Sequence, residues 1–195
     1  MLIYNRDDIK IYACALALDT PGRCEGRLIA ERKAVDSLVR EALSDYPSVC
    51  IAHRPDGSPY LTDRPENTGK TIYPAISVSH CRTMAAIILT PPSLSPGIDC
   101  ETRDRSHTLL KVAARYLSPS QLKDWASSPE RLLRAWCIKE AIYKALRIEG
   151  LPLADIPLPP ADKADATETT VTMAGRSLTL ITLPDFNSTP VTAVF

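Results

Sequence analysis

The sequence has no excess of charge of either sign. Its 195 residues include 23 Lys and Arg and 23 Asp and Glu, so the formal net charge is zero. Broad binding to nucleic acid or another polyanion usually requires a basic surface, and the composition gives no support for it. The hydrophobic fraction of 45% and the charged fraction of 24% are ordinary for a globular protein, and the length allows one large domain or two small ones.

Paired cysteines and long apolar runs are also missing. The cysteines are Cys14, Cys24, Cys50, Cys81, Cys100 and Cys137. Since none forms a Cys-x-x-Cys pair, we expect buried thiols in a reducing compartment rather than a zinc site or a disulfide framework. Apolar runs such as 84–89 are far too short to span a bilayer, and the N-terminus becomes charged within eight residues, unlike a signal peptide. We therefore predict a cytoplasmic protein without a membrane partner.

Apolar spacing and turn residues predict a mixed α and β protein in two parts. In the first part we expect a helix at 31–44 and strands at 9–18, 49–52, 59–62, 75–78 and 85–89. In the second part we expect helices at 108–117, from Pro119 with Ser118 as N-cap, and at 131–147, and strands at 96–101, 169–173, 177–183 and 191–195. The three prolines of segment 90–96 predict a stiff linker between the parts.

The first motif that carries chemistry lies in the strand predicted at 96–101. Asp99 and Glu101 are two residues apart, and side chains at that spacing on a strand point to the same face. Ile98 and Cys100 then point to the opposite face. The pattern predicts a pair of carboxylates on one side of a strand, although such a pair could also be the polar side of an exposed strand.

The second motif lies in the helix predicted at 131–147. Glu140 and Lys144 are four residues apart and therefore one turn above each other. They could form an ordinary solvated pair. However, apolar residues occupy two sides of this helix, which is typical of a helix buried between layers. A carboxylate there needs a cationic partner from the protein or a metal ion, and three carboxylates with open coordination sites suit Mg²⁺.

Together with two upstream segments, these motifs resemble the signature of the 4′-phosphopantetheinyl transferase superfamily. Residues 97–101 are similar to its Gly-Ile-Asp-x-Glu motif, and residues 136–144 to its Trp-x-x-Lys-Glu-Ala-x-x-Lys motif. Residues 57–61, Gly-Ser-Pro-Tyr-Leu, resemble its Gly-Lys-Pro segment, and residues 77–80, Ser-Val-Ser-His, its Ser-His segment. The similar segments follow the family's order and cover most of the chain.

The resemblance implies the family's α+β fold, in which two similar α/β halves are related by a pseudo-twofold axis. We expect the single-chain, two-half type that activates surfactin synthetase, with an N-terminal half at 1–92 that contributes to coenzyme A binding. The C-terminal half, 93–195, would hold the metal site, the catalytic helix and the carrier-protein contact. The sequence shows no repeat between the halves, and we expect a monomer.

The resemblance also implies an activity. The protein would transfer 4′-phosphopantetheine from coenzyme A to a serine hydroxyl of an apo acyl or peptidyl carrier protein, releasing 3′,5′-ADP. Asp99, Glu101 and Glu140 would hold Mg²⁺. Glu140 would also act as general base, and Lys144 would stabilise or protonate the leaving group. The alternative is a non-catalytic relative that binds coenzyme A or a carrier protein.

Motif position also implies the residues that contact coenzyme A. They are Arg32, Arg54, Gly57, Ser58, Pro59, Ser77, Ser79 and His80. The two arginines could instead be surface charges, and Gly57 and Pro59 simple turn residues. We assign Trp136 to core packing and Lys139 to a partly exposed contact.

Departures from the family pattern affect three places. Ser58 replaces the lysine of the Gly-Lys-Pro segment, Gln121 replaces a frequent glutamate, and segment 145–151 alters a glycine-rich turn. The metal triad and Lys144 are unaffected.

Between residues 103 and 123, the sequence has five basic residues and one acidic residue, Asp104. This strip is predicted to dock the acidic surface of a carrier protein, although a solvated helix face would give the same pattern.

Overall fold

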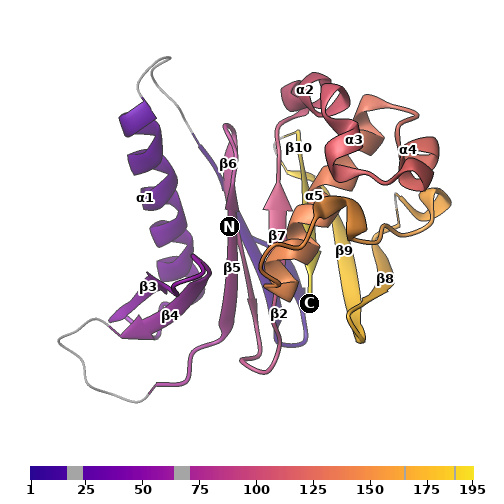
Figure 1. Cartoon of the computed structure of the whole chain (residues 1–195). Coiled ribbons are helices and arrows are strands. Elements are labelled where there is room, and N and C mark those ends of the chain that lie inside the picture. The colour runs from indigo at the N-terminus through magenta and orange to yellow at the C-terminus, as the bar shows by residue number, and fades with distance from the viewer. Residues whose placement is uncertain (17–23, 64–70, 165, 187) are drawn as a thin grey trace.

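A computed structural model describes residues 1–16, 24–63, 71–164, 166–186 and 188–195. Two antiparallel sheets pack face to face, and helices cover the outer face of each sheet (Figure 1). The order of the layers is therefore helix, sheet, sheet and helices. The mixture of helices and strands agrees with the sequence prediction.

The first sheet has the strand order β1-β2-β6-β5. Its strands are β1 (Leu2–Arg6), β2 (Ile9–Ala15), β5 (Ala75–His80) and β6 (Met84–Thr90). Helix α1 (Cys24–Ala42) covers its outer face. The strands predicted at 49–52 and 59–62 are confirmed as β3 (Val49–His53) and β4 (Pro59–Asp63), which pair as a hairpin.

The second sheet has the order β7-β10-β9-β8. Its strands are β7 (Gly97–Cys100), β8 (Glu168–Met173), β9 (Arg176–Phe186) and β10 (Thr189–Val194). The helices on its outer face are α2 (Ser106–Lys111), α3 (Ala113–Tyr116), α4 (Pro119–Trp125) and α5 (Pro129–Leu146). Short 3₁₀ turns occupy Arg103–Arg105, Leu153–Asp155 and Ala161–Lys163.

Strand β6 shows why its sequence is apolar without interruption. Met84, Ala86 and Ile88 belong to the core between the two sheets. The alternate residues Ala85, Ile87 and Leu89 belong to the core under α1. Because successive side chains of a strand point to opposite faces, a strand between two layers needs apolar residues at every position.

The two sheets meet where β5 faces β7, and serine hydroxyls connect the strands. Ser77 Oγ accepts a hydrogen bond of 3.2 Å from the Ile98 amide. Ser79 Oγ accepts one of 3.3 Å from the Cys100 amide and donates one of 2.9 Å to Asp99 Oδ1. We call this β5–β7 contact the seam. It fixes the position of β7 through side chains of the first sheet.

Several sequence predictions need correction. The helix expected at 108–117 is two short helices, because Val112 leaves the helical conformation with φ −113°. Valine is β-branched, restricted at χ1 and only a modest helix former. The apolar spacing of 108–117 is helical throughout and therefore gave no sign of this break. Strand β1 was not predicted, and α1 begins at Cys24 rather than at 31. The strand predicted at 9–18 ends at Ala15, and residues 17–18 lie outside the described part of the chain.

The cysteines and helices give two further findings. Among the cysteines whose side chains the structure describes, Cys14, Cys50, Cys81, Cys100 and Cys137 are free thiols, as predicted. The last three are buried as expected, whereas Cys14 and Cys50 are only partly buried. In the described ranges, no helix combines the length and apolar character that crossing a bilayer would require.

Gly97, the first residue of β7, is expected to be intolerant of any side chain. A Cβ atom there would lie 1.8 Å from the Ala141 carbonyl oxygen of α5, so the helix or the strand would have to move. Overpacking against rigid backbone costs about 3 kcal/mol or more. Gly97→Ala should therefore lower the free energy of unfolding by roughly this amount in urea denaturation.

Gly26 provides the matched control, because a Cβ atom there has open space around it on α1. Gly26→Ala should stabilise the protein by about 0.5–1 kcal/mol, the usual gain within a helix. If Gly97→Ala unfolded at the same urea concentration as the wild type, the close packing of α5 on β7 would be wrong.

Candidate active site

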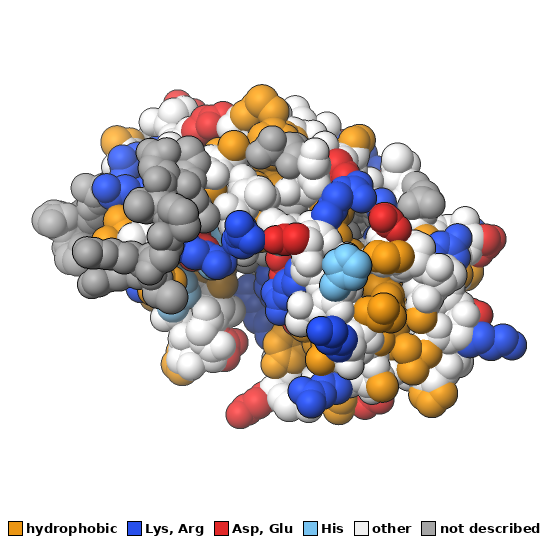
Figure 2. Space-filling view, turned by 90° about the horizontal axis from the view of Figure 1, so that it is seen from above, with side chains coloured by type: hydrophobic (Ala, Val, Ile, Leu, Met, Phe, Trp, Pro, Cys, Tyr) orange, Lys and Arg blue, Asp and Glu red, His pale blue; other side chains and the backbone are white. Residues whose placement is uncertain are grey.

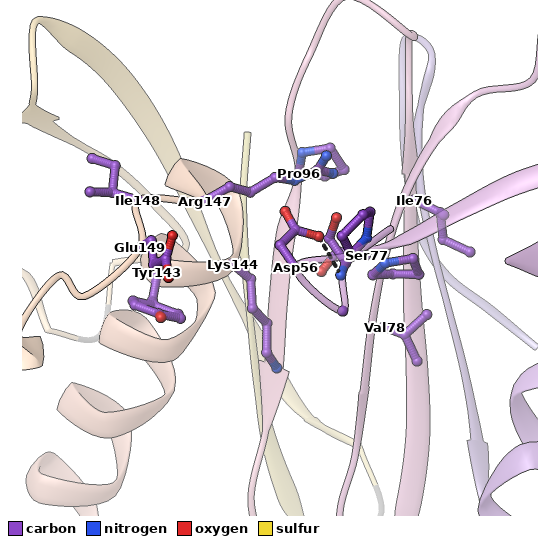
Figure 3. A pocket seen from close by; sticks show the side chains of 14 residues that line it. Asp56, Ile76, Ser77, Val78, Pro96, Tyr143, Lys144, Arg147, Ile148 and Glu149 are labelled. Atoms are coloured by element: carbon purple, nitrogen blue, oxygen red, sulfur yellow. Dashed lines mark hydrogen bonds between the residues drawn. The ribbon is translucent and has the colours of Figure 1, made fainter. Parts of the chain in front are cut away.

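Two adjoining cavities lie between the β3–β4 turn, the seam and helix α5. The larger cavity has a volume of about 640 Å³, and Figure 3 shows side chains of its lining. The second has a volume of about 430 Å³, and we call it the carboxylate cavity. The residues shared by both linings are Gly57, Pro59, Val78 and Lys144. A ligand that spans both cavities would therefore pass Lys144.

Asp99 is held at the wall of the carboxylate cavity by groups from two other elements. It lies on the face of β7 opposite to Ile98 and is only 7% exposed. Its Oδ1 atom accepts hydrogen bonds from Ser79 Oγ at 2.9 Å and from Lys144 Nζ at 2.8 Å. Lys144 Nζ also donates to the Ile98 carbonyl oxygen at 2.9 Å. Burial lowers the pKa of Lys144, but the Asp99 carboxylate outweighs it and the net shift is upward.

Glu101 follows β7 directly and lines the same cavity. Its Oε1 atom accepts a hydrogen bond of 2.9 Å from the Thr102 amide, and its Oε2 atom forms an ion pair with Arg105. The Arg105 guanidinium lies over the Trp136 ring, 5.3 Å from the centroid. Arg105 therefore neutralises Glu101, and sequence reasoning missed this role although the two residues are four apart.

Glu140 differs from the other two carboxylates because it makes no hydrogen bond or ion pair within the described part of the chain. It lies on α5 one turn before Lys144 and lines the carboxylate cavity. Burial raises the pKa of Glu140, and so does the charge of Asp99; Lys144 acts in the opposite direction. The ionised form of Glu140 is therefore disfavoured, and a cation in the cavity would stabilise it.

The three carboxylates fit a divalent cation by their chemistry. Among the described residues, no group of three His, Cys, Asp or Glu side chains is already arranged as a metal site. Asp99 and Glu101 are instead paired with Lys144 and Arg105. All three nevertheless line one cavity, and one of them is unpaired. Hard carboxylate oxygens are the donors that Mg²⁺ prefers.

His80 is oriented by a buried glutamate that the sequence did not reveal. Glu31 of α1 is 3% exposed, and its Oε2 atom lies 3.4 Å from His80 Nδ1. Its Oε1 atom accepts a hydrogen bond of 2.6 Å from Arg27 Nε. Helix α1 thus positions the His80 ring, which lines the carboxylate cavity. The spacing of Arg27 and Glu31 was the available signal.

The other predicted coenzyme A contacts divide into three groups. Gly57, Ser58, Pro59 and Ser77 line the larger cavity, while Ser79 lines the carboxylate cavity. Arg54 donates to the Pro59 carbonyl oxygen at 3.1 Å and to Ser58 Oγ at 3.4 Å. Arg32 is exposed on α1 and is not among the lining residues of either cavity, so its contact stays a prediction.

The assignment of Lys139 to a partly exposed contact was wrong. Lys139 is fully buried rather than partly exposed, and burial lowers its pKa to about 8. Its Nζ atom donates to the carbonyl oxygens of Leu153 and Ile156, at 2.8 and 2.5 Å. The core-packing assignment of Trp136 is confirmed in part: Trp136 is half-buried, packs against the core and forms an edge-to-face pair with Tyr116, with ring centroids 5.2 Å apart. It also lines the carboxylate cavity, which was not predicted. The error at Lys139 arises because segment 153–156, distant in sequence, covers its face of α5.

Gln121 has a structural role that a glutamate could not fill. Its side-chain oxygen accepts from the Ser118 amide, and Ser118 Oγ accepts from the Gln121 amide, which forms a capping box. Its side-chain nitrogen donates to the Ile156 carbonyl oxygen at 2.9 Å. A carboxylate has no hydrogen to donate there. The predicted N-cap at Ser118 with Pro119 following is confirmed.

Comparison with known proteins adds one finding. Residues 95–183 match the family model described as the 4′-phosphopantetheinyl transferase superfamily. This segment contains Asp99, Glu101, Glu140 and Lys144, whereas the cavity wall formed by residues 53–80 precedes it. A comparison with curated proteins gave no match.

Proposed function

Because residues 95–183 match the family model of the 4′-phosphopantetheinyl transferase superfamily, we propose that the protein transfers 4′-phosphopantetheine from coenzyme A. The acceptor is a serine hydroxyl of an apo acyl or peptidyl carrier protein, and the second product is 3′,5′-ADP. The observation that carries the proposal is the carboxylate cavity. Asp99, Glu101, Glu140 and Lys144 line it together, next to a larger cavity of suitable size for a nucleotide.

The proposed reaction forms a bond between the serine oxygen and the β-phosphorus of coenzyme A. The bond from that phosphorus to the bridging pyrophosphate oxygen breaks, and 3′,5′-ADP leaves with the electron pair. Glu140 takes the serine proton, because it is the carboxylate without a partner in the cavity and its raised pKa makes it a stronger base. Lys144 places a positive charge where negative charge develops on the leaving group.

Asp99, Glu101 and Glu140 are the residues that would hold Mg²⁺, which when bound neutralises charge on the pyrophosphate oxygens. Ser79 and Lys144 restrain one oxygen of Asp99 from two sides. The protein thereby orients this carboxylate before any ligand enters, which reduces the reorganisation needed for catalysis.

The alternative is a relative that binds coenzyme A or a carrier protein without turnover. The observation against it is the unpaired, partly buried Glu140, since a protein that only binds an anionic ligand gains nothing from a carboxylate in that position. The decisive experiment incubates the protein with coenzyme A, Mg²⁺ and an apo carrier protein. A phosphopantetheine mass increase on the carrier supports transfer, and binding without this increase supports the alternative.

This proposal also includes a pseudo-twofold relation between two halves divided at residue 92, a monomeric state and a cytoplasmic location. The architecture supports the division to this extent: residues 1–92 and 93–195 each contain a four-stranded sheet covered by helix.

We propose that the carrier protein docks on the basic strip between residues 103 and 123. Arg103 and Arg105 form ion pairs with Asp185 and Glu101. The remaining excess therefore lies on the exposed residues Lys111, Arg115 and Lys123. In Figure 2, which views the molecule from above, Lys and Arg side chains lie next to hydrophobic ones on the side of the molecule that carries α2, α3 and α4.

Reversing two of these charges tests the docking surface. Lys111→Glu with Arg115→Glu should raise KM for an acidic carrier about tenfold or more, because like charges then repel, without changing KM for coenzyme A. For the wild type, KM for the carrier should rise with salt. The control is Lys33→Glu with Arg40→Glu, two exposed positions on α1. Unchanged carrier kinetics in the first variant would place docking elsewhere.

A further inference from the structure

Arg147, the residue that ends helix α5, has a backbone conformation that favours glycine. Its φ and ψ angles are 54° and 39°, in the left-handed region. A side chain there is strained, and helices commonly end with glycine at such a position for this reason. An arginine in this place suggests that the side chain does something that glycine cannot do.

The Arg147 side chain lines the larger cavity. Figure 3 shows it extending from the end of α5 toward Pro96 and Asp56, on the opposite wall. It also lines a smaller cavity of about 160 Å³ that Arg54 lines as well. Its Nε atom is buried and has no hydrogen-bond partner among the described residues. A buried donor without a partner is costly, and a ligand oxygen would satisfy it.

The charges around Arg147 are predominantly positive. Burial lowers the pKa of Arg147, and the nearby Arg54 and Arg176 guanidinium groups lower it further. Asp56 opposes them, but its Oδ1 atom already accepts a hydrogen bond of 2.8 Å from the Ser58 amide. Glu149 also lines the larger cavity, as an exposed residue. Three guanidinium groups against two carboxylates, one of which is engaged by a backbone amide, favour the binding of an anion.

We propose that Arg147, together with Arg54, binds the 3′-phosphate of coenzyme A and selects coenzyme A over its 3′-dephospho form. This inference rests on the proposed function. With the reacting pyrophosphate beside Lys144, at the border of the two cavities, this assignment places the nucleotide in the larger cavity, which Arg147 lines. The phosphate that remains is a monoester with a charge of about −1.5 to −2, which matches two guanidinium groups. The cation missing at Ser58 is thereby supplied from the end of α5.

The experiment measures binding of coenzyme A and 3′-dephospho-coenzyme A by isothermal titration calorimetry, without carrier protein. The wild type is expected to bind coenzyme A about tenfold to hundredfold more tightly, the range for loss of a charge-assisted hydrogen bond. Arg147→Met and Arg147→Gly should lose this preference through weaker binding of coenzyme A alone. Because glycine adopts the left-handed conformation without strain, Arg147→Gly should melt at or above the wild-type temperature, which excludes a folding defect.

Arg40→Met, an exposed position in the last turn of α1, is the matched control and should keep the preference. A preference that persists in both Arg147 variants would overturn the assignment. So would equal binding of the two ligands by the wild type, and if such a protein still modified a carrier, the proposed transfer would stand. If the wild type bound neither ligand, the proposed function would fail as well.

Discussion

Glu140→Gln is expected to lower the rate of phosphopantetheine transfer by about 10²–10⁴-fold, the usual contribution of a general base, or by more if a metal ligand is lost too. The substitution keeps the size of the side chain and removes only its charge. Burial and the Asp99 carboxylate raise the pKa of Glu140, so its contribution to stability is present below the unfolded pKa and is lost as pH rises through the folded pKa. At neutral pH the glutamine variant should therefore melt at or above the wild-type temperature.

A second measurement distinguishes the role of Glu140 as a metal ligand from its role as general base. Mg²⁺ should raise the melting temperature of the wild type but have less effect on Glu140→Gln, and Asp99→Ala should behave similarly. The control is Glu130→Gln, an exposed position in the first turn of the same helix. Near-normal turnover of Glu140→Gln, or activity that survives EDTA, would contradict the assignment of this residue.

Lys144→Met is expected to reduce both activity and stability. Lys144 Nζ donates hydrogen bonds to Asp99 Oδ1 and to the Ile98 carbonyl oxygen, so its removal leaves the Asp99 carboxylate with Ser79 as donor but without its cationic partner, and takes one donor from the Ile98 carbonyl. Breaking a buried pair costs about 3–5 kcal/mol, and less here because the Lys144 side chain is 29% exposed. Transfer should fall about 10²–10³-fold, as for the loss of a donor to developing negative charge.

A double substitution distinguishes the two effects. Asp99→Asn with Lys144→Met should recover stability, because residue 99 then no longer carries a charge that lacks its partner, but should not recover activity. Lys144→Arg should restore activity only in part, since the guanidinium is planar and larger than an ammonium group. Lys33→Met, an exposed position on α1, serves as control. A fully active Lys144→Arg variant would reduce Lys144 to a charge partner of Asp99.

The sequence was informative where chemistry depends on spacing within one element. The alternation of side chains along β7 correctly placed Asp99 and Ile98 on opposite faces of the strand. The helical spacing correctly placed Glu140 and Lys144 on the same side of α5, where both line one cavity. The partner of Lys144 could not be chosen in this way. Spacing favoured Glu140, four residues away, whereas the observed ion pair is with Asp99, 45 residues away. Only the packing of α5 against β7 decides between them.

The remaining errors also depend on tertiary contacts. Lys139 was assigned to the surface because lysine is usually exposed, but segment 153–156 covers it with two carbonyl groups. The end of α5 near residue 147 was expected, yet apolar periodicity contains no information on a left-handed residue. The orienting role of Glu31 depends on how α1 lies across the outer face of the first sheet, and no local pattern specifies that.

The seam between β5 and β7 makes the candidate active site a property of the assembled molecule. Asp99 stands on the second sheet, but one group that restrains its oxygen, Ser79, comes from the first sheet, and another, Lys144, from α5. Neither sheet contains the arrangement by itself. A chain in which only one sheet has formed therefore lacks the candidate site, which arises only in the folding step that joins the two sheets.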